Sequence, residues 1–226
     1  MAILADGVTP TQLLAIDNNY KALRASARPV EHGAGGQYRL AAQVQLIATQ
    51  AANGTLFSFR WGSSTLLAVI QHLRLTVQQT GAATATIWPN FQIFQARSFT
   101  VSDSVGTALT ITGNSFKTRT SMATTAVTDI RVASAAAGLT VGTRTLDGDP
   151  ILSMPAPQLI TGIPVAAATT QLTPITQEVD MRGGLAHPLV LAQNEGFIVR
   201  GPSVIFGAAG TANLLVEVAW AEVPSY

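Results

Sequence analysis

The stretch LLAVIQHLRLTVQ, residues 66–78, decides the fold. From Leu73 to Val77 every second residue is apolar, and the residues between them are Arg74 and Thr76. This period of two matches the alternation of side chains on a β-strand that buries one of its faces. The stretch therefore predicts a strand, and similar patterns on both sides of it extend the prediction over most of the chain.

Nine further stretches favour strands, because they carry β-branched and aromatic residues between turn-forming residues. They are residues 38–48, 56–61, 85–99, 109–112, 127–132, 140–146, 196–199, 203–206 and 213–223. Short strands separated by turn signals every 8–12 residues or so are typical of an antiparallel sandwich or barrel. No helical crossovers connect them, which argues against a parallel sheet. We expect an all-β fold, an antiparallel, jelly-roll-like sandwich over residues 37–226.

The first 36 residues show a helical pattern in place of the alternation typical of strands. Thr9 is a suitable helix cap and Pro10 suits a first helical turn. Apolar residues then follow at helical spacing, namely Leu13, Ile16, Tyr20 and Leu23. We expect residues 1–36 to form a short helix and an arm that precede the sandwich.

Composition excludes several classes of protein. Charged residues make up 11% of the chain, its net charge is +1 and it has no cysteine, whereas soluble domains average about 25% charged residues. No strong field attracts nucleic acid, and disulfides, thiolate catalysis and cysteine zinc sites are ruled out. Residues 151–177 are apolar and uncharged, but four prolines within them argue against a membrane span. The N-terminus carries no readable signal peptide.

Residues with catalytic potential are few and scattered. The three histidines, His32, His72 and His187, show no metal-ligand spacing, and Asp147-Gly148-Asp149 favours a turn over a calcium loop. No nucleophile, metalloprotease or phosphate-loop motif is present. We therefore expect no enzyme activity, no cofactor, no metal and no small-molecule substrate.

Arginine outnumbers lysine eleven to two. A planar guanidinium suits pairing at interfaces, although a GC-rich genome would give the same bias. Six of the eleven arginines fall in two regions, namely Arg24, Arg28 and Arg39 near the arm, and Arg119, Arg131 and Arg144 in the central region.

Residues 133–177 are rich in Ala, Thr and Pro but also contain apolar side chains, which argues against a solvated linker. We expect this segment to lie extended along another surface and to pair with it by strand addition. If that surface belongs to another subunit, the chain is an obligate oligomer.

Several stretches resemble virion structural proteins encoded in tailed-bacteriophage genomes. They are DGVT (6–9) with LLAID (13–17), LFSFRW (56–61), RSFTVSD (97–103), LTITGN (109–114) with KTRTSM (117–122), and GTRTLD (142–147). The resemblance spans most of the chain and contains no catalytic signature. It implies a capsid decoration (cement) protein or a tail component, commonly a β-sandwich that assembles as a homo-oligomer.

We therefore expect a non-enzymatic protein on the capsid surface of a virion, assembled in the host cytoplasm. Its expected partners are the major capsid protein and copies of itself, with a trimer as the natural order, and neither nucleic acid nor a membrane. The expected contact residues are Leu13, Ile16, Tyr20, Arg24, Arg28, Ile151, Leu152, Met154, Leu159, Ile160 and Ile163. Two alternatives remain: a tail or baseplate component, and a receptor- or carbohydrate-binding module using Trp61, Trp88 or Trp220, for which a place in the core is favoured.

Overall fold

A computed structural model describes most of the chain. The described residues are 16–17, 22–23, 36–47, 51–79, 90–134, 138–155, 175–180, 188–201 and 211–224. The chain divides into two compact units, Met1–Val30 and Glu31–Tyr226. This boundary lies close to the one expected between the arm and the sandwich.

In the first unit, β1 (Ile16–Asp17) and β2 (Ala22–Leu23) pair as antiparallel strands, with Ile16 opposite Leu23. At these residues paired extended backbone replaces the predicted helix. A short amphipathic helix is marginal in water unless its apolar face packs against another element, so spacing alone does not ensure it. The other residues behind that prediction, Leu13 and Tyr20, lie outside the described residues.

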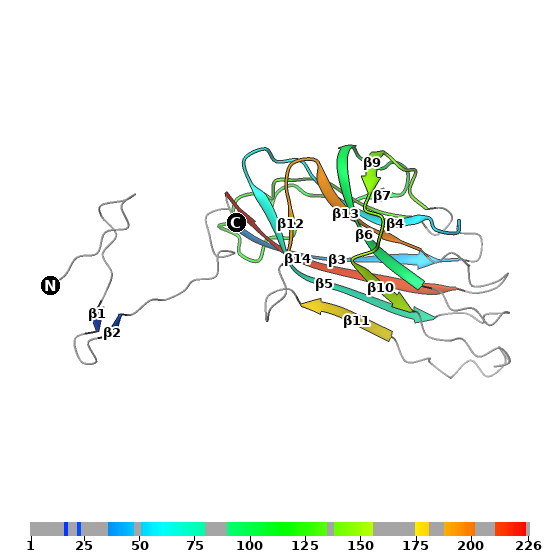
Figure 1. The fold of residues 1–226 in the computed structure, drawn as a ribbon, viewed down its shortest axis with the longest axis horizontal. Helices are drawn as coiled ribbons and strands as arrows, with labels where there is room; N and C mark the ends of the chain where they lie inside the picture. The colour runs from blue at the N-terminus through cyan, green and yellow to red at the C-terminus, as the bar shows by residue number, and fades with distance from the viewer. Residues whose placement is uncertain are drawn as a thin grey trace. The chain divides into compact units, whose positions relative to one another are not determined.

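The second unit is built from two antiparallel sheets (Figure 1). The first sheet has the order β11-β5-β14-β3, with β12 beside β5, and the second has the order β10-β6-β13-β4-β8-β7, with β9 beside β6. The strand bounds are β3 Gly36–Leu46, β4 Thr55–Trp61, β5 Leu67–Gln79, β6 Asn90–Val101, β7 Thr107–Ala108, β8 Val127–Val132, β9 Thr143–Leu146, β10 Leu152–Pro155, β11 Ile175–Asp180, β12 Leu189–Leu191, β13 Glu195–Arg200 and β14 Ala212–Val223.

The strand pairing is nested. β3 pairs with β14, β4 with β13, β5 with β11, and β6 with β10. An antiparallel ribbon rolled up in this way, with its strands divided between two sheets, is a jelly roll. The predicted all-β, jelly-roll-like sandwich is thus confirmed. Between β6 and β10 the chain makes an insertion, residues 102–151, whose strands β7, β8 and β9 add to the second sheet.

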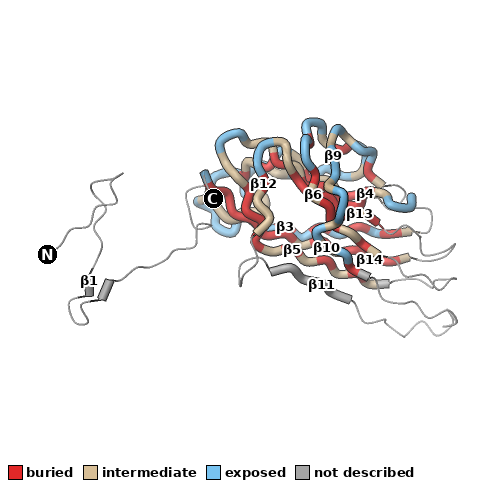
Figure 2. Tube along the Cα trace, viewed as in Figure 1, coloured by how far each residue is buried: buried red, intermediate tan, exposed pale blue. Residues whose placement is uncertain are grey.

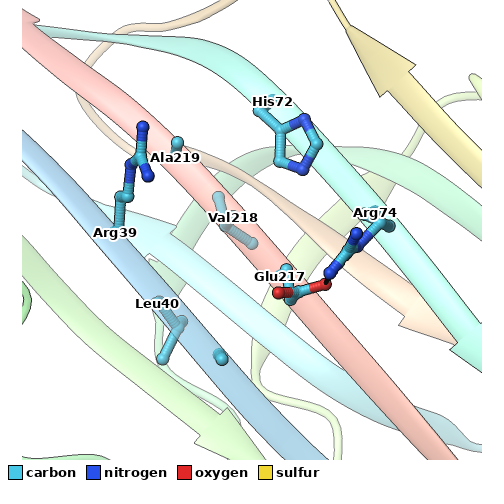
Figure 3. Close-up of a pocket in the computed structure, with 8 residues that line it drawn as sticks. Arg39, Leu40, His72, Arg74, Glu217, Val218 and Ala219 are labelled. Atoms are coloured by element: carbon cyan, nitrogen blue, oxygen red, sulfur yellow. Dashed lines mark hydrogen bonds and ion pairs between the residues drawn. The ribbon is translucent and has the colours of Figure 1, made fainter.

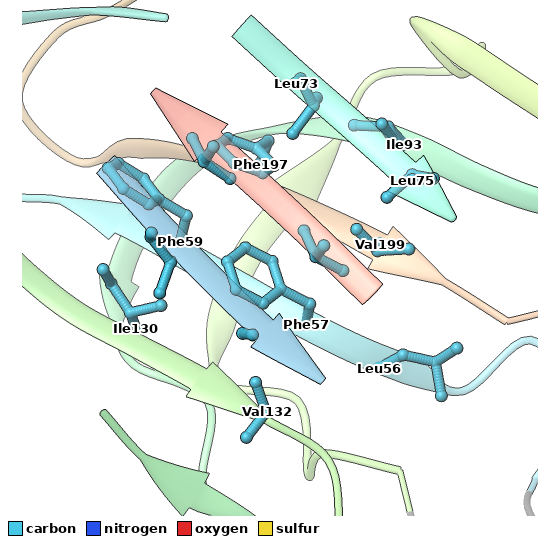
Figure 4. Close-up of a cluster of buried hydrophobic side chains, with 14 of the residues drawn as sticks. Leu56, Phe57, Phe59, Leu73, Leu75, Ile93, Ile130, Val132, Phe197 and Val199 are labelled. Atoms are coloured by element: carbon cyan, nitrogen blue, oxygen red, sulfur yellow. The ribbon is translucent and has the colours of Figure 1, made fainter. Parts of the chain in front are cut away.

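The core lies between the two sheets (Figure 4). Phe59 of β4 stacks on Phe197 of β13, with ring centroids 5.2 Å apart, and meets the edge of Trp220 of β14 at 5.3 Å. Trp220 in turn stacks on Tyr38 of β3 at 5.4 Å. This chain of aromatic contacts joins the sheets, and each of these side chains is at most 1% exposed.

The alternating stretches became strands because one face of each could enter this core. The stretch at 66–78 forms most of β5, with Leu73, Leu75 and Val77 buried and Arg74 and Thr76 on the outer face. Other predicted strands are confirmed with small shifts at their ends, except that 109–112 is replaced by β7 just before it and that residues 85–89 of the strand expected at 85–99 lie outside the described residues. The strand expected at 203–206 lies outside the described residues.

The segment 133–177 needs a correction. Its described parts pair within the same chain: β9 and β10 with β6, and the start of β11 with β5. The surface along which they extend therefore belongs to this subunit. The pattern predicted β9 within 140–146 but missed β10 and β11, because backbone hydrogen bonds can be made without apolar alternation.

Replacing Phe59 by alanine should remove the ring at the centre of the aromatic contacts. We expect Phe59→Ala to lower the free energy of unfolding by about 3–5 kcal/mol, measured by urea denaturation. The control is Thr100→Ala at an exposed position, which should change it by no more than about 0.5 kcal/mol. A loss below about 1 kcal/mol for Phe59→Ala would contradict the core described above.

Candidate functional site

The exposed large hydrophobic side chains of the described residues all lie between Val101 and Ile151. They are Val101, Val105, Val141, Leu146 and Ile151, exposed by 54, 54, 60, 36 and 46%. Three of them, Val101, Val105 and Val141, are here called the apolar rim. Figure 2 shows the exposed stretches of the insertion near β9, beyond the buried strands of the sandwich.

The apolar rim is formed by two segments that are bonded to each other. Ser104 and Thr140 exchange backbone hydrogen bonds of 2.9 and 3.0 Å, which join the segment after β6 to the segment before β9. Next to this bridge, Val105 has a φ of 62°. A β-branched residue rarely adopts this left-handed conformation, which costs about 1–3 kcal/mol. The surrounding contacts therefore hold Val105 in place.

A buried ion pair supports the apolar rim from beneath. Arg144 binds Asp103, and their side chains are 2 and 0% exposed. Asp103 also accepts a hydrogen bond of 2.8 Å from the backbone of Gly142, and Arg144 donates one of 2.9 Å to Thr55 of β4. The guanidinium of Arg144 lies 5.1 Å from the centre of the Phe99 ring. The rim is thus anchored to the second sheet through charge-assisted hydrogen bonds.

Arg60 of β4 fixes the end of β6 in a similar way. Its guanidinium donates to the backbone oxygens of Phe99 and Thr100, both at 2.7 Å, and to the Ser102 hydroxyl at 3.0 Å. These bonds hold the strand where its pairing with β9 shifts register, just before the apolar rim. A cation in this position satisfies carbonyl groups that the irregular ladder leaves open.

A polar hollow of about 390 Å³ lies on the outer face of the first sheet (Figure 3). Two rows of residues cross the strands there. Arg39, Ala219 and His72 are Cα partners in one row, and Ala41, Glu217 and Arg74 are partners in the next. The small side chains of Ala219 and Ala41 leave the space that the longer side chains surround.

The chemistry of the polar hollow is limited to polar recognition. Its one carboxylate, on Glu217, is ion-paired with Arg74, so the group best suited to act as a base is already neutralised by a partner. Arg39 makes no side-chain hydrogen bond or ion pair to the described residues, so its guanidinium is available to bind an anionic group. The hollow can bind an anion weakly, because its charges are partly exposed to water.

A third polar cluster lies inside the sandwich, at the end of β14. Glu222 is 1% exposed and accepts hydrogen bonds from the hydroxyl of Thr125, the backbone of Ala126 and the indole of Trp220. Burial raises the pKa of Glu222, although these bonds oppose the shift. Burial, with a smaller effect of the Glu222 charge, also raises the pKa of Tyr38 to about 12. The cluster ties the insertion to the first sheet.

The residues predicted to contact partners have different positions. Ile151 is exposed and Leu152 is half-buried against the core. The prediction that Met154 contacts a partner is corrected by the structure, in which this side chain is 1% exposed and belongs to the core. The pairing of β10 with β6 turns it inward. The side chain of Ile16 is not described, and the remaining predicted contacts lie outside the described residues, namely Leu13, Tyr20, Arg24, Arg28, Leu159, Ile160 and Ile163.

Other candidates from the sequence are also placed. Trp61 and Trp220 are fully buried core residues, as favoured, while Trp88 lies outside the described residues. His72 lies on the polar face of its strand, as expected, and Asp147-Gly148-Asp149 lies in the connection between β9 and β10. His32 and His187 fall outside the described residues.

Two of the central arginines pair within the chain. Arg144 binds Asp103 with its side chain only 2% exposed, whereas Arg131 pairs with Asp129 and keeps 26% of its side chain exposed. Sequence reasoning missed the apolar rim and the polar hollow. The rim valines come from the end of β6 and from two loops, and the rows of the hollow depend on strand register, which spacing along one strand does not reveal.

No protein-family model, curated protein or solved structure matches this chain significantly. Within the described residues, no helix has the length and apolar character needed to cross a bilayer. In that same part of the chain, no three His, Asp or Glu side chains are grouped as metal ligands would be.

Removing the charge of Arg144 should leave the Asp103 carboxylate buried without its cation. We expect Arg144→Met to lower the free energy of unfolding by about 3–5 kcal/mol, measured by urea denaturation. The double variant Asp103→Asn with Arg144→Met removes both charges and should recover part of this loss. Equal losses in the single and double variants would contradict a role for charge compensation.

Glu222 should make stability depend on pH. Its ordinary pKa is 4.5 and burial raises it in the folded protein, so the folded state binds this proton more tightly than the unfolded chain does. The resulting stabilisation is fully present below the unfolded-state pKa and is lost as pH rises through the folded-state pKa. We expect Glu222→Gln, which cannot ionise, to flatten that fall in urea midpoints measured from about pH 4 upward.

The matched control is Asp149→Asn, which removes an exposed carboxylate and should leave the pH profile close to that of the unmodified chain. A profile for Glu222→Gln that still falls as steeply as the unmodified one would show that another group causes the loss.

Proposed function

We propose that this chain is a non-enzymatic structural protein of a bacteriophage virion, binding the capsid lattice from outside as a decoration protein that stabilises the head. Its partners are the major capsid protein and further copies of itself. The resemblance of its sequence stretches to tailed-phage virion proteins motivates the proposal. The apolar rim is the observation that carries it.

The fold is compatible with this proposal without selecting it. Jelly rolls occur in viral capsid proteins, but also in lectins and cupins, so function has to be argued from surfaces. A carbohydrate-binding module would use exposed aromatic rings for stacking against the sugar. Trp61 and Trp220 are buried and serve the core instead. Among the candidate rings of that alternative, only Trp88 remains.

The apolar rim has the properties of a contact surface. Its valines are more than half exposed, and the backbone bonds between Ser104 and Thr140 hold the segments that carry Val105 and Val141 beside each other. They are held by the buried Asp103–Arg144 pair and by the Arg60 bonds, so little conformational freedom is lost when a partner covers them. The three valines carry no charge, so a partner can bury their side chains without removing water from an ion, although the partly exposed guanidinium of Arg131 bonds the Val105 carbonyl beside them.

A charge placed in the apolar rim should therefore prevent attachment. We expect Val141→Asp to reduce occupancy on capsids by about tenfold or more, because the new carboxylate would lose its water at the contact. The measurement mixes purified chain with capsids of the encoding phage that lack it, pellets the particles and quantifies bound chain by gel densitometry. Bound chain should also raise the melting temperature of the capsids in calorimetry.

The matched control is Gln78→Asp, which introduces the same charge on the outer face of β5, in the other sheet. It should leave occupancy unchanged. Equal binding of Val141→Asp and the unmodified chain would exclude the apolar rim as the contact. Copy number tests the placement: a number matching the lattice supports decoration, and a handful of copies per particle would place the chain in the tail instead.

A further inference from the structure

The edge of the first sheet at β3 is open along part of its length. β3 is the last strand of that sheet and pairs with β14 on one side only (Figure 3). Two hydrogen bonds on the side of β3 that faces away from β14 show which way its backbone N–H and C=O groups point. Arg39 donates its N–H to Phe116, and the carbonyl of Gln37 accepts from Thr118. Odd-numbered residues of β3 therefore point their backbone groups away from β14.

Segment 116–118 of the insertion covers the first part of this edge. Beyond it lies the stretch Leu40–Leu46, here called the open edge. The outward N–H and C=O groups of Ala41, Gln43 and Gln45 make no hydrogen bond to any described residue. Their side chains are exposed. Such a row of unpaired groups is a template for another strand.

The open edge lacks the features that normally keep sheet edges apart. It carries no charge and no proline, and its pairing with β14 runs without a bulge. The other edge strands of the described residues differ. β7, β9, β10 and β12 have only two to four residues, β10 ends at Pro155, and β11 contains Glu178 and Asp180. An unprotected edge of this length is expected where it is covered in the assembled protein.

We propose that the open edge pairs with the open edge of a second copy of this chain, antiparallel and around a two-fold axis at Gln43. In this register Gln43 meets Gln43 of the second copy, and Ala41 meets its Gln45. Each of the three outward pairs exchanges two hydrogen bonds, so about six join the copies. The two first sheets then form one continuous sheet.

The open edge is complementary to itself, so a second copy of this chain fits it. Outward residues of one strand must face outward residues of the other, and a two-fold axis at Gln43 satisfies this for every pair in the open edge. Segment 116–118 of each copy ends the ladder where it begins to cover the other strand, which fixes the register. Small Ala41 opposite long Gln45 avoids crowding, and no like charges meet.

This contact would supply the self-association of the proposed function, as a dimer in place of the expected trimer. Its test needs only the purified chain, so its outcome is separate from that of capsid binding. A dimer that does not bind capsids would overturn the decoration role alone. A monomer that does bind them would overturn this inference alone.

A charge swap tests the axis directly, because residue 43 would meet itself. We expect the unmodified chain to be a dimer in sedimentation velocity, and Gln43→Lys and Gln43→Glu each to dissociate at least about tenfold more readily at low salt. An equal mixture of the two variants should recover dimers. A monomeric or trimeric unmodified chain, or variants that stay dimeric alone, would overturn the proposal.

A second pair of variants tests the backbone bonds. Gln43→Pro removes an N–H that points away from β14, so the fold should keep its ladder while the dimer is lost. Gln43→Ala keeps the N–H and should stay dimeric. Circular dichroism and urea denaturation confirm that both variants are folded. A folded Gln43→Pro dimer would show that the copies meet through another surface.

Discussion

The pairing of β3 with β14 is the constraint on which the rest of the structure depends. It joins the first strand of the sandwich to the last, along eleven residue pairs from Gly36–Glu222 to Leu46–Ala212. Because of this register Tyr38 stacks on Trp220, and Trp220 in turn meets Phe59 of the other sheet. The same pairing brings Glu222 to the insertion and makes β3 an edge strand, so core, buried polar cluster and open edge share one origin.

The sequence shows most clearly those strands whose one face enters the core. The alternation from Leu73 to Val77, and similar patterns in β3 and β14, mark one face for burial and one for solvent. β10, β11 and β12 are short and lack such alternation, so their strand character comes from partners far away in the sequence. Spacing along one segment cannot reveal such partners.

The candidate surfaces were harder to predict than the fold. The apolar rim combines the end of β6 with two loops, and its exposure depends on how Asp103 and Arg144 hold those loops together. The polar hollow depends on the rows that place Ala219 between Arg39 and His72. Met154 shows the opposite error, since an apolar residue in an uncharged segment was assigned to a partner and instead fills the core.

The few charged side chains of the described residues lie mainly where they bind other groups of the same chain. Most described arginines bind groups of their own chain, as Arg60, Arg97 and Arg144 do, and Asp147 and Glu195 are engaged by Arg97. The hydrogen bond that Arg97 donates to Asp147 contributes most to the raised pKa of Arg97. The few charges therefore brace loops and strand ends; Arg131 does so beside the apolar rim, and the open edge itself carries no charged residue. Because these surfaces belong to different sheets, one subunit could bind a lattice through one and a neighbour through the other.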